Sequence, residues 1–103
     1  MSLQCAACRA DLAPEAVLSS ARHAWPHGWQ DFVCPHCGGV GLFEIHGQQL
    51  TIGAPDGFPG PCFRVESEQG VPGLVSERNE NNDLAVRIGD RQWTIRSRVL
   101  RNA

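Results

Sequence analysis

Two Cys-x-x-Cys pairs are the feature that most constrains the fold of this chain of 103 residues. Cys5 and Cys8 form the first pair, Cys34 and Cys37 form the second, and 25 residues separate the two pairs. Each pair can close a tight turn that directs both sulfurs toward one point, and four thiolates satisfy the tetrahedral coordination of Zn²⁺. Gly38 suits such a turn because a left-handed backbone costs glycine little. The spacing therefore predicts a four-cysteine metal site.

The segment from residue 5 to residue 46 resembles a zinc ribbon, in which a hairpin carries the second Cys pair at its tip. The two knuckles are also similar to those of rubredoxins. The first resemblance implies a small fold held by a structural zinc ion, and the second implies an iron centre for electron transfer. Zinc ribbons serve unrelated functions, so the likeness implies fold and metal rather than role. Four sulfur ligands also leave no open coordination position for Lewis-acid catalysis.

Other uses of these side chains are weaker. His23 and His27 follow the first Cys pair at the spacing of a two-Cys, two-His finger, but a proline and a glycine beside His27 oppose the helix that such a finger needs. The second pair reads Cys-Pro-His-Cys, as in an oxidising thioredoxin-like protein, but the glycines after it cannot open the required helix. Cys62 lies between a proline and a phenylalanine, so we expect a small buried residue there.

The first half of the chain predicts one helix and a meander of short strands. Residues 10–22 contain the helix candidate, with Pro14 in the first turn, where its missing N–H is not needed. Residues 30–33 and 40–45 are strand candidates on either side of the second Cys pair, and residues 48–52 extend the meander.

A run rich in glycine and proline, residues 53–61, marks a linker between two lobes. The clearest pattern lies near the C-terminus, where residues 84–88 and residues 91–100 alternate between apolar and polar. Gly89-Asp90 between them is typical of a two-residue hairpin turn. With that turn, Val86 lies opposite Trp93 and Leu84 lies opposite Ile95.

We therefore divide the chain into a zinc-ribbon module over residues 1–52 and a small antiparallel β lobe over residues 62–103. Within this lobe we expect a strand over residues 62–66 and a polar loop over residues 77–83. The predicted fold class is mainly β, a small α+β fold in which a four-cysteine zinc ribbon with one short helix precedes a small antiparallel sheet. Structural zinc contributes on the order of 10–16 kcal/mol, so we expect a chelator to unfold at least the first 46 residues.

Charge is unevenly distributed in the second lobe. Residues 66–83 hold five acidic residues and one Arg, whereas residues 87–101 hold five Arg and one Asp. In one interpretation the two blocks neutralise each other across the hairpin, for example with Asp83 beside Arg96. In the other, an arginine-lined strand face meets phosphates or an acidic partner, and its candidate residues are Arg87, Arg96 and Arg98.

The sequence lacks the usual equipment of an enzyme, such as a nucleophile with a base or a glycine loop before a helix. We therefore expect a non-catalytic zinc protein that binds another protein, with Trp25 and Trp29 as aromatic anchors. A nucleic-acid-binding ribbon that uses the Arg-rich hairpin, and a rubredoxin-like iron protein, are the alternatives. A further hypothesis is an accessory protein whose C-terminal lobe binds the partner while the ribbon only nucleates the fold.

Two observations bear on the compartment. The chain has no apolar run near the roughly 20 residues that span a bilayer, and no basic stretch followed by an apolar core begins it. Paired Cys-x-x-Cys motifs without such a signal indicate metal thiolates in a reducing environment. We expect a cytoplasmic protein with no membrane contact and no small-molecule substrate.

Overall fold

The computed structural model describes residues 3–26, 28–53 and 67–98. Within these ranges the chain is mainly strand, with one α-helix, α1 (Pro14–Ser20), and all of its sheets are antiparallel. The predicted fold class is therefore confirmed.

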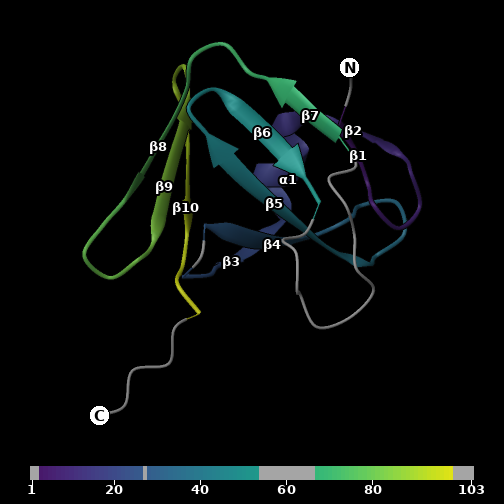
Figure 1. Ribbon diagram of the computed structural model, residues 1–103, viewed down its shortest axis with the longest axis horizontal. Coiled ribbons are helices and arrows are strands. Elements are labelled where there is room, and N and C mark those ends of the chain that lie inside the picture. Colours follow the sequence, from purple (N-terminus) through teal and green to yellow (C-terminus); the bar gives the residue numbers. More distant parts are fainter. Residues whose placement is uncertain (1–2, 27, 54–66, 99–103) are drawn as a thin grey trace.

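The largest sheet has five strands in the order β3-β4-β5-β6-β7 (Figure 1). The three strands predicted around the second Cys pair are β4, β5 and β6, and their observed ends lie within one residue of the prediction. The helix packs against β4 and lies behind the sheet in Figure 1. The strands are β3 (Ala21–Ala24), β4 (Trp29–Val33), β5 (Val40–His46), β6 (Gln49–Ile52) and β7 (Ser67–Gly70).

Two smaller sheets contain the remaining strands of the described residues. A short hairpin of β1 (Leu3–Gln4) and β2 (Asp11–Leu12) encloses the first Cys pair. The second small sheet has the order β10-β9-β8, formed by β8 (Leu74–Arg78), β9 (Leu84–Ile88) and β10 (Arg91–Ile95).

The hairpin predicted near the C-terminus is present with the predicted register. Val86 lies opposite Trp93, and Leu84 lies opposite Ile95. Gly89 has a φ of 58°, the left-handed conformation that glycine accepts without steric cost at the first position of such a turn.

Two predicted boundaries were wrong. The helix expected over residues 10–22 ends at Ser20, because the chain then becomes β3 and Ala21 lies opposite Phe32 of β4. The polar loop expected over residues 77–83 begins two residues later, because the first two of these residues belong to β8 and pair with β9. In both places the pairing of distant strands outweighs local propensity.

One cluster of buried side chains connects the sheets and the helix. Phe32 and Phe43 meet edge to face, with ring centroids 5.9 Å apart. Val17 and Leu18 reach the same cluster from the helix. A Cβ on Gly41 would lie 2.6 Å from the Phe32 ring, so a glycine in β5 allows this ring to lie across the strand.

The predicted linker, residues 53–61, lies outside the described residues except for Gly53, as do Cys62 and the strand expected over residues 62–66. The division into two lobes stays a prediction. β7 and the three-stranded sheet both follow that linker in the sequence. β7 pairs with β6 in the largest sheet, and Leu74, Val86 and Ile95 join the same buried cluster as Phe32.

Candidate metal centre

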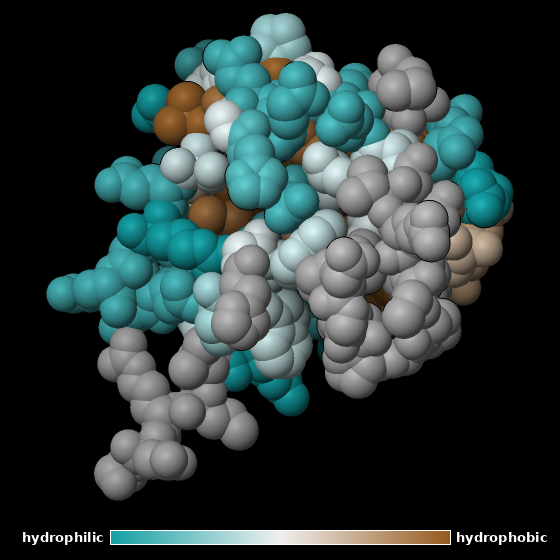
Figure 2. Space-filling model, in the orientation of Figure 1, coloured by the Kyte–Doolittle hydropathy of each residue, from teal (hydrophilic) through white to brown (hydrophobic). Residues whose placement is uncertain are grey.

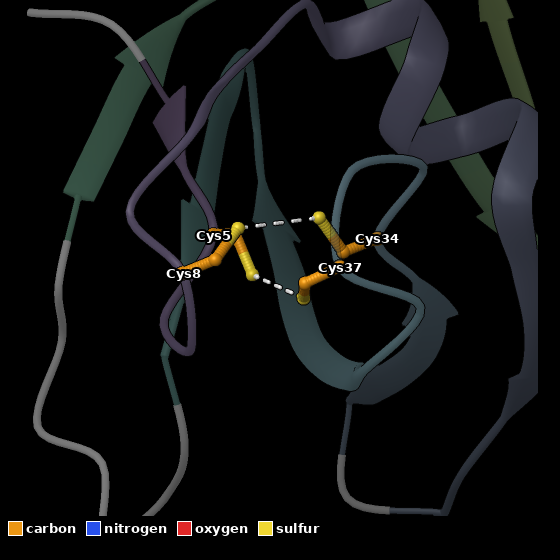
Figure 3. A group of neighbouring side chains, drawn as sticks. All are labelled: Cys5, Cys8, Cys34 and Cys37. Atoms are coloured by element: carbon orange, nitrogen blue, oxygen red, sulfur yellow. Dashed lines mark hydrogen bonds between the residues drawn. The ribbon is translucent and has the colours of Figure 1, made fainter.

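The four predicted ligand sulfurs come together in one cluster (Figure 3). All four lie within 4.8 Å of one another. The Sγ atoms of Cys5 and Cys37 are 3.9 Å apart, and those of Cys8 and Cys34 are 3.7 Å apart. A tetrahedral ion with Zn–S bonds of about 2.3 Å separates its sulfurs by about 3.8 Å. The cluster therefore has the dimensions of a four-cysteine metal site.

The first knuckle is built on the β1–β2 hairpin. The Cys5 N–H donates to the Ala10 carbonyl at 3.0 Å, and the Arg9 N–H donates to the Cys5 carbonyl at 2.9 Å. The Ala7 N–H points at the Cys5 sulfur, with the nitrogen 3.4 Å from Sγ. Backbone hydrogen bonds thus close the turn and also direct a donor at the sulfur, which stabilises negative charge on it.

The second knuckle repeats this pattern between β4 and β5. The Cys34 N–H donates to the Gly39 carbonyl, and the Gly38 N–H donates to the Cys34 carbonyl, both at 2.9 Å. The N–H groups of His36 and Gly39 donate to the sulfurs of Cys34 and Cys37, each at 3.4 Å. The two knuckles present their sulfurs through the same hydrogen-bonded turn.

Burial differs within each pair. Cys5 and Cys34 are only 2 % and 1 % exposed and belong to the hydrophobic core cluster, whereas Cys8 and Cys37 are exposed. One sulfur of each knuckle is therefore anchored in the protein interior while the other faces solvent. A metal held by all four would connect the N-terminal hairpin to the large sheet at the edge of the core.

The thiols also differ in acidity. Burial by itself would raise the pKa of Cys34, but the N–H groups of Cys37 and His36 and neighbouring thiols lower this pKa to about 6. At Cys8 the N–H of Ala10 by itself would lower the pKa. Desolvation and hydrogen bonds with the other thiols outweigh it and raise that pKa to about 11. A metal that binds near neutral pH must therefore displace the proton of Cys8.

The donor set fits a tetrahedral metal ion that prefers sulfur. Four thiolates fill the coordination shell, so no ligand position is open to water or substrate. Both zinc and iron accept such a set. When bound, the ion supplies a crosslink between the two knuckles, and the chain supplies the charge and the orientation of the sulfurs.

The alternative uses of these side chains that the sequence left open find no support at this cluster among the described residues. His23 lies in β3, where its backbone N–H donates to the Asp31 carboxylate at 2.6 Å, and it is not part of the cysteine group. His27 lies outside the described residues. The second Cys pair is followed by strand β5 rather than a helix, as expected if it is not a thioredoxin-like dithiol.

The two predicted tryptophan anchors are placed differently. Trp25 is 37 % exposed and meets the His23 ring, with centroids 6.5 Å apart. Trp29 is only 8 % exposed. An anchor must be accessible before the partner arrives, so of the two only Trp25 is available in this structure.

The three candidate arginines do not form one strand face. Arg87 is exposed on β9, whereas Arg96 and Arg98 follow β10 on the segment that bridges to β3. Arg96 lies 3.7 Å from the Asp83 carboxylate, the neutralising pair anticipated from the sequence. At 80 % exposure of the arginine side chain this ion pair contributes little to stability.

A polar hollow of about 170 Å³ between β8 and the ends of β4 and β5 was missed from the sequence. Its walls include Gln30 and Arg78, which are far apart in the chain. Gln30 is a buried amide in a strand, and its side-chain oxygen has no hydrogen-bond partner among the described residues. An uncharged polar residue inside an apolar strand was the only sequence signal for this feature.

None of the helices in the described ranges is both long enough and apolar enough to cross a membrane. Searches of protein-family models, curated proteins and solved structures found no match to this chain. Any conclusion about function therefore depends on the geometry of the cysteine cluster itself.

Proposed function

We propose that this chain is a zinc protein with a structural, non-catalytic four-cysteine site, and that the fold held by this site binds another protein. One observation carries the first part: two equivalent knuckles bring four sulfurs to the spacing of a tetrahedral ion. Because one sulfur of each knuckle belongs to the core, the ion stabilises the whole fold rather than a surface loop.

Zinc is favoured over iron because Arg9 follows the first Cys pair, whereas rubredoxin-like knuckles typically read Cys-x-x-Cys-Gly. A four-thiolate shell offers no position for a reactant, which supports a non-catalytic role. A reducing compartment such as the cytoplasm would keep all four thiols available as ligands.

The interaction role is supported by the exposed Trp25 and by a formal net charge of −2, which gives no general attraction to polyanions. Figure 2 shows small separate hydrophobic spots among hydrophilic residues on the side of β8 to β10, not one continuous apolar surface. A partner that binds this side of the molecule therefore has to use local anchors and polar contacts.

Nucleic acid is a second candidate partner, favoured by two contacts that connect an arginine to an exposed tryptophan through a histidine. Arg98 reaches His23, with Nη1 3.5 Å from Nε2, and His23 meets the exposed Trp25 ring. An arginine joined to an exposed aromatic ring through one histidine offers groups for the phosphate and the base of a single strand. Binding of mixed DNA or RNA pools that weakens steeply with salt would favour this candidate, and no binding at low salt would exclude it.

The first test is elemental mass spectrometry of the untagged full chain, together with its visible absorption spectrum. We expect one zinc per chain, a colourless protein, and loss of the zinc in Cys34→Ser. One iron per chain with a visible band that bleaches on reduction would contradict the proposal, and so would a folded chain without metal.

The interaction role is tested by affinity capture with the wild type and Trp25→Ala as matched baits. We expect the substitution to leave zinc content unchanged and to weaken retention of a specific protein partner. Equal retention by both baits would contradict a role for Trp25.

A further inference from the structure

Strand β8 has one unpaired edge in the described part of the chain. It pairs with β9 on one side, and no described strand pairs with its other side. Ile88 and Arg91 flank the two-residue turn, so they exchange backbone hydrogen bonds. Because bonded pairs alternate along an antiparallel ladder, Ala85 and Arg87 direct their backbone groups toward β8 instead.

The register then fixes which backbone groups of β8 are free. Val75 lies opposite Arg87 and Glu77 lies opposite Ala85, so these two β8 residues bond to β9. The Asn79 N–H continues the same alternation by donating to the Asp83 carbonyl at 3.0 Å. The N–H and C=O groups of Ser76 and Arg78 therefore point away from the sheet, where another strand can pair with them.

The polar hollow lies along this edge. Ser76, Glu77 and Arg78 are consecutive, and all three line it. Side chains alternate along a strand, so three consecutive residues share one hollow only where the edge of the strand opens into it. Gln30 and Ile45 of the large sheet form the facing wall.

The chemistry of the hollow favours an acidic, hydrogen-bonding side chain. The Arg78 guanidinium donates to the backbone and side-chain oxygens of Asn82, at 3.3 and 3.4 Å, and both oxygens are neutral. No carboxylate of the described residues forms an ion pair with it. Burial lowers the pKa of Arg78, which marks a partly desolvated cation. Gln30 adds a buried oxygen that lacks a donor, which a hydroxyl or amide next to the acidic residue can supply and a carboxylate cannot.

The other charged side chains at the hollow either lie beside a partner or point outward. Glu44 lies 3.0 Å from His46 and forms an ion pair with it when that imidazole is protonated. Glu77 is exposed and shares the outer face of β8 with Val75, which is 50 % exposed. The outer face thus offers one apolar and one acidic residue to a neighbouring strand, while the inner face offers an arginine.

We propose that an extended segment of a partner protein adds to the free edge of β8 as a further strand and places an acidic side chain opposite Arg78. This inference rests on the proposed interaction function, whose partner it describes. Main-chain hydrogen bonds to Ser76 and Arg78 supply affinity, and the hollow supplies specificity for the inward side chains.

A second copy of this chain fits the same edge less well. Antiparallel self-pairing centred on Ser76 would set Arg78 opposite Leu74 and Glu77 opposite Val75. Both charges would then face apolar residues across the new ladder, whereas opposite-charge pairs stabilise such a ladder. The register therefore favours a segment with a different sequence.

The test is an NMR titration of the ¹⁵N-labelled, zinc-loaded full chain with the capped peptide acetyl-Glu-Lys-Thr-Val-Val-amide. In antiparallel pairing this probe sets its Glu opposite Arg78, its Lys opposite Glu77, its Thr opposite Ser76 and its first Val opposite Val75. We expect saturable shifts of the Ser76 and Arg78 amides and slower hydrogen exchange at both. The reversed sequence tests parallel pairing, and a probe with Gln in place of Glu should bind more weakly.

Ser76→Pro removes the outward N–H without removing a hydrogen bond to β9. We expect it to lower the affinity for the peptide probe by at least about fivefold, the equivalent of one hydrogen bond. Gln92→Pro is the matched control, because Gln92 directs its backbone away from β9 on the opposite edge strand, and binding should be unchanged. Arg78→Gln should abolish the preference for the Glu probe over the Gln probe, and it keeps the test valid if the proline variant does not fold.

Several outcomes would overturn the inference. They are equal binding by Ser76→Pro and wild type, shifts confined to another surface, and no shift by any probe at millimolar concentration. Concentration-dependent self-association that Ser76→Pro removes would assign the edge to a second copy instead. Zinc content is measured on every sample, because loss of the metal would count against the proposed function, whereas failed binding by zinc-loaded protein counts against the β8 site alone.

Discussion

The two knuckles reach the same geometry from different sequences. Each places a residue with positive φ directly after its second cysteine: Arg9 at 62° in the first and Gly38 at 72° in the second. Glycine adopts this conformation without steric cost, whereas a residue with a Cβ is disfavoured there by roughly 1–2 kcal/mol. The hydrogen bonds around the turn are nevertheless equivalent.

The conformation of each turn is therefore set by the sulfur cluster that it presents, and not by the local preference of the residue after the second cysteine. Backbone donors directed at sulfur, together with the proposed metal crosslink of four thiolates, would exceed the strain at Arg9 by several fold. The knuckles also differ in their support. The first stands on strands of two residues each, and the second joins two strands of the five-stranded sheet. The first therefore depends more on the metal.

Metal removal should have the largest effect and should affect the first knuckle before the second. Structural zinc contributes on the order of 10–16 kcal/mol, so a strong chelator should unfold the chain through at least residue 46. Because its strands are shorter, the first knuckle should reach the hydrogen-exchange rate of an unstructured peptide at the Cys5 and Arg9 amides. The Cys34 and Gly38 amides should lose their protection later in the same unfolding. Unchanged protection in both knuckles after metal removal would refute this expectation.

The loss of stability on substituting one ligand should depend on how buried that cysteine is, and not on which knuckle contains it. Cys34→Ser removes a ligand and also buries a hydroxyl in the core, whereas Cys37→Ser places its hydroxyl at the surface. We expect Cys34→Ser to lower the free energy of unfolding by a further 1–3 kcal/mol or so relative to Cys37→Ser. Denaturant unfolding of the two variants in the same excess of zinc measures the difference. Cys5→Ser against Cys8→Ser should repeat the ranking, and equal losses within each pair would contradict it.

Metal affinity should fall as the pH falls, in two regimes. The pKa of Cys8 is about 11 in the metal-free chain, so binding near neutral pH displaces at least one proton, and affinity should rise by at least about tenfold per pH unit. Below about pH 6 the Cys34 thiol also holds its proton, and the dependence should steepen. Competition with a chromophoric chelator from pH 5 to pH 8 measures the slope. Affinity independent of pH across this range would contradict the assignment of these thiols as ligands.

The smallest expected effects concern the left-handed residues themselves. Gly38→Ala meets open space but acquires the strain of a Cβ, so it should destabilise the protein by about 1 kcal/mol. Arg9→Gly should stabilise it by a similar amount, about 1 kcal/mol at most. Arg9→Ala is the control, since it keeps the strain and removes only the side chain. If Arg9→Ala stabilises as much as Arg9→Gly, side-chain contacts rather than backbone strain explain the change.

Local patterns predicted the elements that depend on nearby residues. The Gly89 turn and the register of its hairpin followed from alternation and turn chemistry. The knuckles followed from cysteine spacing, because a Cys-x-x-Cys turn closes within a few residues. The strand after the helix was not predicted, since its pairing with β4 and the bridge from Ala24 to Ser97 involve partners that local propensity does not report.

Cysteine spacing was enough to identify the four side chains that could hold a metal, because soft ligands in two short turns leave few alternatives. Only the packing of the chain shows which sulfur of each pair is buried, that Trp29 is interior while Trp25 is exposed, and that no other described strand covers the edge of β8 beside Arg78. These outcomes depend on strand order and on packing between distant segments. Such packing is settled by the whole core at once and leaves little trace in any short stretch of sequence.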